Sequence, residues 1–241
     1  MNDYVKDIAK IDKLDRFNAI IGILKENNIK YRIQGLRERD SIGNIVVEYN
    51  EGKDDKIVVG AHYDNVEGTP GANDNASACS ILLNLIIDLK DTNKHIEFVF
   101  FDLEEYGGIG SYDYIKRNNT PIKLCINLDM CGIGDSIVLS SDYVNNNDYL
   151  DIFNKYDVTI VRKLPPGDGV LFIENRIPTL YVINSCKCDI DWYKNYYKGF
   201  NRYYPDSIKT MHTPYDTVDK INYKEIEEIK NFIKEIIKNT K

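Results

Sequence analysis

The sequence predicts an α/β protein of three layers, α/β/α, with a central mixed and mostly parallel sheet between the helices. Segments patterned like buried strands alternate along the 241 residues with segments of helical spacing, which favours a sheet covered on both faces. Some strand segments are apolar throughout instead of alternating with polar residues, as is typical of strands inside a parallel sheet.

The first half of the chain is predicted to form two helices with strands between and after them. The first helix has apolar residues at intervals of mostly three and four, which place them on one helical face. The second has an apolar body and a possible polar cap at Asn73 or Asp74. The predicted segments are a helix from about Asp3 to Asn27, strands at Tyr31 to Leu36, Asn44 to Tyr49 and Lys56 to Ala61, a helix from Asp74 to Leu89, and a strand from Ile96 to Phe101.

The second half continues the alternation and ends with an amphipathic helix. At the start of this last helix, Asn222 and Glu225 resemble a capping box. No repeat or low-complexity linker interrupts the pattern, so we predict a single domain over residues 1–241. The predicted segments are a helix from about Gly110 to Arg117, a strand from Leu124 to Leu128, short strands at Ile137 to Leu139, Val158 to Val161 and Thr179 to Ile183, a helical stretch near Val170 to Glu174, and a helix from Asn222 to Lys238.

Net charge and hydropathy disfavour two kinds of partner. Lys and Arg total 31 against 38 for Asp and Glu, which gives a formal net charge of −7 with histidine neutral. Such a chain repels a phosphate backbone, so nucleic acid is not an expected partner. No stretch approaches the roughly 20 apolar residues of a membrane helix, so we expect no membrane partner either. The sequence leaves the oligomeric state open.

Cysteine usage and the amino terminus predict a cytoplasmic location. The first residues lack the basic start and the continuous apolar core of a secretory signal. The five cysteines are odd in number and sparse, which favours a reducing compartment. Cys186 and Cys188 lie one residue apart, a spacing too short for an ordinary disulfide, so we interpret them as two loop thiols rather than a redox or metal pair.

Three successive core strands run directly into residues that can bind a metal. Further candidates stand at the head of the helix after the first of these strands and in a late loop. Because ligand sites of open α/β sheets lie at the carboxyl ends of the strands, we expect these side chains to meet at one edge of the sheet. The candidates are His62, Asp64, Asp74, Asp102, Glu104, Glu105, Asp129 and His212.

Each candidate has an ordinary structural interpretation when it is taken alone. A histidine at a strand end is more often a hydrogen-bonded loop residue than a ligand. The paired glutamates could be solvated, and the aspartates could be a helix cap and a turn residue. Their joint occurrence favours a site instead, because it takes up two of only three histidines, His62 and His212. The third, His95, starts its strand at the opposite end and is predicted to lie on the surface.

The donor set predicts two zinc ions and an amide substrate. Three carboxylates and two imidazoles form a mixed oxygen and nitrogen set of the kind that holds two zinc ions, with one carboxylate shared. Two such ions activate water for attack on a carbonyl, and a further carboxylate must take the proton of that water and pass it to the leaving amine. The doublet Glu104-Glu105 offers one carboxylate of each kind, because adjacent side chains at a strand end diverge.

Five motifs resemble, in the same order, those of the di-zinc exopeptidases of metallopeptidase family 28. They span residues from about 57 to 217, and together they are specific although each alone is weak. The family includes aminopeptidases, glutamate carboxypeptidase and glutaminyl cyclases, and the resemblance implies a phosphorylase/hydrolase-like zinc exopeptidase architecture. The motifs are Gly60-Ala61-His62-Tyr63-Asp64, Gly71-Ala72-Asn73-Asp74-Asn75-Ala76-Ser77-Ala78, Phe101-Asp102-Leu103-Glu104-Glu105-Tyr106-Gly107, Asn127-Leu128-Asp129-Met130 and His212-Thr213-Pro214-Tyr215-Asp216-Thr217.

Carried over residue by residue, the resemblance implies roles for seven side chains. A ligating imidazole usually donates its other N–H to a carboxylate or a carbonyl, which supports one of these roles independently. The implied roles are one zinc bound by His62 and Asp129, a second bound by Glu105 and His212, a bridge between them at Asp74, a general base and acid at Glu104, and a carboxylate at Asp64 that orients His62.

Two segments need a separate interpretation. Gly167 to Phe172 look like a degraded form of the family's Ser-Asp-His-x-x-Phe, with Asp168 and Phe172 kept. The missing serine and histidine argue against a substrate contact from that loop but leave the metal site unaffected. Asp191 to Tyr204 are rich in aromatic residues, Phe200 among them. This segment could wall a pocket for an apolar amino-terminal residue, or it could pack as core or as a subunit contact.

The sequence therefore predicts a zinc-dependent aminopeptidase that removes the first residue of peptide substrates. Glutaminyl cyclisation, in which the substrate's own amine attacks, is an alternative because those relatives keep many of the same motifs. A carboxypeptidase fits less well, since that branch usually carries extra domains. A non-catalytic binding protein on the same scaffold is a third alternative, which the intact set of ligands and base disfavours.

Overall fold

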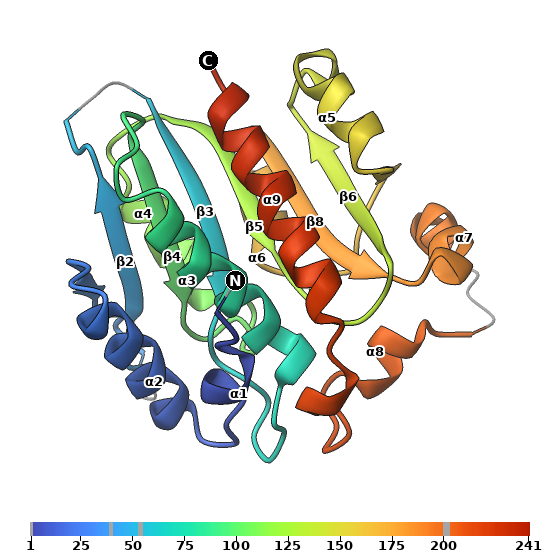
Figure 1. Ribbon diagram of the computed structural model, residues 1–241, viewed down its shortest axis with the longest axis horizontal. Coiled ribbons are helices and arrows are strands. Elements are labelled where there is room, and N and C mark those ends of the chain that lie inside the picture. Colours follow the sequence, from blue (N-terminus) through green and yellow to red (C-terminus); the bar gives the residue numbers. More distant parts are fainter. Residues whose placement is uncertain (1, 39–40, 53–54, 200–202) are drawn as a thin grey trace.

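In a computed structural model of the chain, the described residues form one mixed sheet of eight strands with helices on both of its faces (Figure 1). It describes residues 2–38, 41–52, 55–199 and 203–241. The strands are β1 (Arg32–Gln34), β2 (Asn44–Tyr49), β3 (Lys56–His62), β4 (Ile96–Phe101), β5 (Ile122–Leu128), β6 (Ser136–Asp142), β7 (Thr159–Val161) and β8 (Thr179–Ser185). Across the sheet they follow the order β1-β2-β4-β3-β5-β8-β6-β7.

Four adjacent strands, β4, β3, β5 and β8, run parallel and form the middle of the sheet. β2 pairs antiparallel with β4, β1 with β2, and β6 with β8, whereas β7 runs parallel to β6 at the other edge. β3, β4 and β8 are buried along their whole lengths, as expected for strands covered on both faces. The predicted mixed, mostly parallel sheet is confirmed.

Alternate side chains of the strands enter separate cores on the two faces. The helices are α1 (Val5–Ile8), α2 (Lys13–Glu26), α3 (Ala78–Asp88), α4 (Ile109–Arg117), α5 (Leu150–Lys155), α6 (Asp168–Glu174), α7 (Ile190–Asn195), α8 (Asp206–Thr210) and α9 (Tyr223–Asn239). Val59 and Ile126 pack under α2, α3 and α9, whereas Val58 and Phe101 pack with Phe172 of α6. Figure 1 shows α3 and α9 in front of the sheet and α4 and α6 behind it.

None of the helices in the described ranges combines the length and the apolarity that a bilayer span requires.

The amino-terminal helix is broken in two, contrary to the single helix predicted from Asp3 to Asn27. α1 ends at Ile8 and α2 begins at Lys13. The carboxylate of Asp12 accepts the backbone N–H of Leu14 at 2.7 Å and so caps α2. The break therefore has a local cause, which is a capping residue inside an otherwise periodic stretch.

The helix predicted from Asp74 to Leu89 becomes regular four residues later than expected. Residues 72–77 form an irregular turn, and α3 begins at Ala78. Asp74 has a non-helical φ of −110° and ψ of 88°, and the peptide bond that follows it is cis. Asn73 and Asp74 do not cap α3, because the N-cap position of this helix is Ser77, and their own backbone N–H groups are donated to the carboxylate of Asp216.

Two predictions at the ends of elements are wrong. The side chain of Asn222 donates to the carbonyl of Gly134 at 2.9 Å and makes no bond to α9, so the predicted capping box with Glu225 does not form. His95 lies at the expected end of its strand, but it is buried rather than on the surface, with Nε2 2.9 Å from Oε1 of Glu48. Glu48 belongs to β2, which pairs antiparallel with β4. This pairing cannot be predicted from the sequence pattern of either strand alone.

Cys186 and Cys188 form a disulfide, so their interpretation as two loop thiols is wrong. A short turn of 3-10 helix at Lys187–Asp189 follows β8 and brings the two Cα atoms to 5.1 Å, which a disulfide can bridge. This bond removes the argument for a reducing compartment that rested on cysteine usage. The remaining cysteines, Cys79, Cys125 and Cys131, are free and buried.

Candidate metal centre

The parallel strands deliver the candidate residues to one edge of the sheet. His62 ends β3, and its partner in the register is Phe101, the last residue of β4. The chain therefore leaves both strands at the same level, and β5 ends beside them. Asp64 follows β3, the pair Glu104 and Glu105 follows β4, and Asp129 follows β5. The turn before α3 contributes Asp74, and the loop before α9 contributes His212.

The five residues predicted to bind metal form two groups that share Asp74. Oδ1 of Asp74 lies 3.1 Å from Nε2 of His62, and Oδ2 lies 3.2 Å from Nε2 of His212. On the first side, Oδ1 of Asp129 is 3.6 Å from Nε2 of His62. On the second side, Oε2 of Glu105 is 2.9 Å from Nε2 of His212. Within each group the potential ligand atoms lie within 4.8 Å of one another.

The chemistry of these donors fits metal ions. Oδ1 of Asp129 and Oε1 of Glu105 are buried, and neither has a hydrogen-bond partner among the residues that the structure describes. A buried carboxylate oxygen without a partner is costly, and a cation in each group would satisfy it. Imidazole nitrogens combined with carboxylate oxygens are donors that zinc accepts. A further group that meets the same 4.8 Å limit joins His62, Glu104 and Glu105.

Asp64 ties the end of β3 to the loop after β4. Its two carboxylate oxygens accept the backbone N–H groups of Glu104 at 3.1 Å and of Glu105 at 3.2 Å. Its Oδ1 also lies 3.4 Å from Nδ1 of His62, and its backbone oxygen lies 3.2 Å from the same nitrogen. Asp64 therefore fixes the imidazole so that Nε2 faces Asp74.

Crowded carboxylates shift the titration of the site. Burial, with help from the carboxylates of Asp168 and Asp129, raises the pKa of Glu104 to about 9, although His62 opposes the shift. Hydrogen bonds with the two carboxylates that it contacts raise the pKa of His212 to about 10. Burial disfavours the charged form of His62, but the surrounding carboxylates outweigh this effect and hold its pKa well above the usual value. The metal-free site thus holds protons where cations would bind.

Left-handed backbone at non-glycine residues occurs at three points of the site. Leu103, directly before Glu104, has a φ of 58°, and Met130, directly after Asp129, has a φ of 45°. His212 itself has a φ of 58°. Such conformations cost on the order of 1–3 kcal/mol each and persist where the surrounding structure imposes them, as it often does at functional sites.

Two residues that support the site had no assigned role in the sequence-based prediction. The carboxylate of Asp216 accepts the backbone N–H groups of Asn73 at 2.8 Å and of Asp74 at 2.9 Å. The hydroxyl of Tyr181 donates to Oδ2 of Asp129 at 2.9 Å. Asp216 belongs to the last motif, which was the available signal, whereas Tyr181 lies within an apolar strand that carries no such signal.

Tyr181 also explains why the stretch from Gly167 to Phe172 departs from the family pattern. A Cβ atom at Gly167 would lie 2.3 Å from the Tyr181 hydroxyl oxygen, and one at Gly169 would lie 2.7 Å from Cγ of the ring. The tyrosine therefore fills the space that side chains at these two positions would need. Asp168 is buried and accepts the hydroxyl of Ser111 at 2.5 Å.

Part of the aromatic segment from Asp191 to Tyr204 packs in the hydrophobic core. Trp192 and Tyr193 are buried with residues of β6, β7 and β8, and their ring centroids are 4.9 Å apart. Phe200 lies outside the described residues. The exposed aromatic residues of this segment are Tyr197, Tyr203 and Tyr204.

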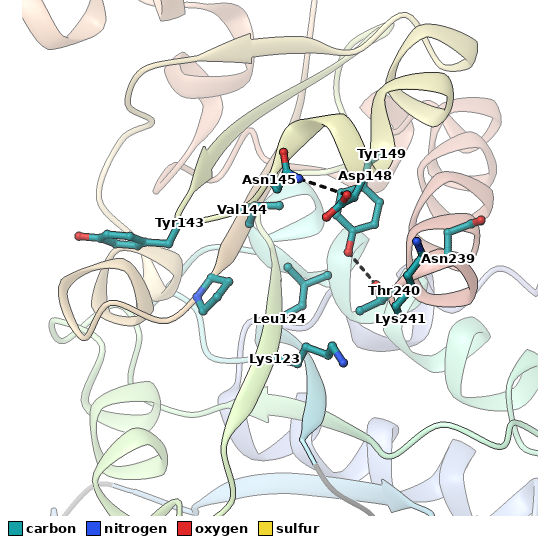
Figure 2. Close-up of a pocket in the computed structure, with 11 residues that line it drawn as sticks. Lys123, Leu124, Tyr143, Val144, Asn145, Asp148, Tyr149, Asn239, Thr240 and Lys241 are labelled. Atoms are coloured by element: carbon teal, nitrogen blue, oxygen red, sulfur yellow. Dashed lines mark hydrogen bonds between the residues drawn. The ribbon is translucent and has the colours of Figure 1, made fainter.

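A separate cavity of about 230 Å³ lies at the opposite edge of the sheet (Figure 2). It is lined by Lys123 and Leu124 at the start of β5 and by Thr240 beyond α9, whose Oγ1 is 3.0 Å from the hydroxyl of Tyr149. The described residues around this cavity include neither a histidine nor any of the candidate ligands. The cavity is therefore distinct from the candidate metal centre.

Comparisons with known proteins agree with the motifs. The family model described as Peptidase family M28 matches residues 44–237. Aminopeptidase YwaD of Bacillus subtilis is 35% identical over 136 residues, which cover 54% of this chain and 25% of that relative. The chain thus spans about a quarter of the length of this relative.

Solved structures with different activities share the fold. BSAP, a zinc aminopeptidase from Bacillus subtilis, matches with a TM-score of 0.65 at 24% identity and covers 79% of this chain and 48% of its own. The glutaminyl cyclase of Tannerella forsythia matches with a TM-score of 0.73 at 21% identity and covers 99% of this chain and 97% of its own. At these identities the likeness concerns the fold alone, and the fold does not separate hydrolysis from cyclisation.

Proposed function

Since this chain belongs to peptidase family M28, we propose that it is a zinc-dependent aminopeptidase that removes the first residue of peptides. One observation carries the proposal, namely two groups of three potential ligands that share Asp74. Glu104 lies beside them, because it forms a group of its own with His62 and Glu105. Such a donor set is suited to two zinc ions with a carboxylate between them.

In this proposal each side chain of the site has a role, and the positions of the side chains support these roles. Two zinc ions held by these groups would polarise the scissile carbonyl and lower the pKa of the attacking water. Glu104 takes the proton of that water and passes it to the leaving amine. Asp64 keeps Glu104 in place through the backbone N–H bond of 3.1 Å and at the same time orients His62.

A peptide digest with a mass readout tests this function. The full chain, purified without chelator and supplied with zinc, is incubated with a library of free peptides, one of which begins with glutamine, and with amino-acetylated copies of the same peptides. We expect loss of the first residue from the free peptides and no change in the acetylated ones.

Each other outcome contradicts the proposal in its own way. Loss of ammonia from the peptide that begins with glutamine would indicate a glutaminyl cyclase. Loss of the last residue would indicate a carboxypeptidase, and internal cleavage of the acetylated copies would indicate an endopeptidase. A protein that retains zinc and leaves every peptide unchanged would be a binding protein on a peptidase scaffold.

A further inference from the structure

Arg16 of α2 is fully buried, and its guanidinium reaches the segment that carries Asp74. Nε donates to the carbonyl of Tyr63 at 2.6 Å. Nη1 donates to the carbonyl of Pro70 at 3.1 Å, and both Nη1 and Nη2 lie 3.4 Å from the carbonyl of Gly71. One side chain therefore holds the chain at two points, at the exit from β3 and three residues before Asp74.

The close approach of Arg16 requires glycine at position 71. Gly71 has a φ of 56°, in the left-handed region. A Cβ atom at this position would lie 2.5 Å from Nη1 of Arg16 and 2.4 Å from the backbone oxygen of Asp74. Glycine thus allows the guanidinium and the turn before α3 to pack directly against each other.

Asp216 holds the same segment through its N–H groups. Its carboxylate accepts the backbone N–H groups of Asn73 at 2.8 Å and of Asp74 at 2.9 Å. The carbonyls at one end of the segment therefore bind Arg16, and the N–H groups at the other end bind Asp216. The side chain of Asp74 takes no part in either contact, and its two oxygens face His62 and His212.

We propose that Arg16 is a positioning residue for Asp74. Its bonds to Tyr63 and to the carbonyls of residues 70 and 71 set the distance between the end of β3 and the turn that carries Asp74. A planar guanidinium with five N–H donors can bind carbonyls on two segments at once. Arg16 lies before residue 44, where the match to the peptidase family begins, so it falls outside the matched residues.

Charge and geometry have opposite effects here, and this difference makes the role testable. A buried cation close to the site opposes the binding of dications by electrostatic repulsion. If Arg16 acted only through its charge, its removal would tighten zinc binding. If Arg16 positions Asp74, its removal weakens zinc binding, because Asp74 is shared by both groups of ligands.

The test compares full-length Arg16→Gln and Arg16→Lys with Lys25→Gln, which removes an exposed charge near the end of the same helix. Zinc dissociation constants are measured by competition with a chromophoric chelator, at a temperature where circular dichroism shows each metal-free variant to be folded. We expect Arg16→Gln to bind zinc about 10- to 100-fold more weakly, the range typical of changes behind metal ligands. Lys25→Gln is expected to match the unaltered chain.

Arg16→Lys separates the two effects if Arg16→Gln fails to fold. Lysine keeps the charge but offers its donors from a single nitrogen, so it cannot hold both segments as the guanidinium does. We expect a loss of affinity smaller than that of Arg16→Gln but clearly measurable. Zinc affinity in Arg16→Lys equal to that of the unaltered chain, or tighter binding by Arg16→Gln, would overturn the proposal. Neither readout requires peptide hydrolysis, so failure of the proposed activity would leave this test intact.

Discussion

The hydroxyl of Tyr181 donates a hydrogen bond to Oδ2 of Asp129 at 2.9 Å. Oδ1 of the same carboxylate is buried without a hydrogen-bond partner in the described part of the chain, and it lies 3.6 Å from Nε2 of His62. The two oxygens therefore have different surroundings. Tyr181 fixes one of them, which leaves the other directed toward the candidate metal position.

Tyr181→Phe removes this hydrogen bond and keeps the ring that packs against Gly167 and Gly169. We expect zinc affinity to fall about tenfold, because Asp129 loses the donor that orients it. Competition with a chelator measures this change. Tyr193→Phe is the matched control, since Tyr193 is also buried but its hydroxyl faces Ser207 at 3.4 Å. Equal zinc affinities in the two variants would show that the Tyr181 hydroxyl does not position Asp129.

The stability of the metal-free protein and the additional stability that zinc confers are expected to change with pH in opposite directions. Burial raises the pKa of Glu104 from 4.5 to about 9, and hydrogen bonds to carboxylates raise the pKa of His212 from 6.5 to about 10. The folded metal-free protein therefore holds protons that the unfolded chain releases. The stabilisation that Glu104 contributes to the folded state is fully present below about pH 4.5 and is lost as the pH rises through about 9. The stabilisation that His212 contributes is fully present below about pH 6.5 and is lost as the pH rises through about 10.

Zinc opposes this trend because it must displace the proton of His212, a proposed ligand, and because its positive charge favours the ionised form of Glu104, so zinc affinity rises with pH. Melting temperatures recorded from about pH 6 to about pH 9 check both statements. The melting temperature of the metal-free protein should fall across this range, while the increase produced by zinc should grow. Glu104→Gln should flatten the first trend. A metal-free protein whose melting temperature rises with pH would contradict the assignment of raised pKa values to these two groups.

The positions of the candidate ligands could be predicted from the sequence because several of these residues lie at the ends of predicted strands. His62 and Asp129 directly follow or end continuous apolar segments, and parallel strands bring their carboxyl ends to one edge whatever the details of the loops. The prediction thus needed only the strands and their direction.

The residues that hold those ligands could not be placed in the same way. Arg16 is 55 residues away from Gly71 in the sequence, and it binds a backbone carbonyl. Every residue type has that carbonyl, so the contact leaves no pattern at the acceptor position. Tyr181 fits equally well into the apolar pattern of β8, and only the structure reveals that its hydroxyl reaches Asp129.

The sequence-based prediction of the fold is wrong mainly where a polar contact determines how a helix begins. Asp12 caps α2 and breaks the expected long helix, whereas Asn222 binds a distant carbonyl instead of capping α9. Both are residue types that favour caps, and the choice between local and distant partners depends on tertiary packing. Periodic apolar residues therefore predict the body of a helix better than its first turn.

Gly60→Ala is expected to destabilise the protein by about 1–3 kcal/mol through overpacking. A Cβ atom at Gly60 would lie 2.4 Å from Cε2 of Phe101, whose ring is fully buried and packs against Tyr114 and Phe172. Urea denaturation of the metal-free protein measures the change in the free energy of unfolding. In Gly22→Ala, the control, no heavy atom lies within 4 Å of the added Cβ. This helix substitution should be neutral or stabilise by up to about 1 kcal/mol. Equal stability of both variants would contradict the close contact at Gly60.

Glu104→Gln tests whether, of the two adjacent glutamates, Glu104 is the general base and Glu105 the zinc ligand. Glutamine keeps the size of the side chain but cannot accept the proton, so we expect kcat on aminoacyl chromogenic substrates to fall by about 10²- to 10⁴-fold. Zinc content, measured by mass spectrometry of the metal, should stay unchanged, because Glu104 belongs to neither of the two groups that share Asp74. Glu105→Gln is the matched variant and should lose zinc, since Oε2 of Glu105 faces His212 at 2.9 Å.

The adjacent pair also defines the result that would reverse this assignment. Glu104 lies close enough to His62 and Glu105 to join them in a third group of potential ligands. If Glu104→Gln lost zinc while Glu105→Gln kept it, Glu104 would be the ligand and Glu105 the base. Full activity of Glu104→Gln would exclude proton transfer by this residue altogether, since no turnover could then depend on its carboxylate.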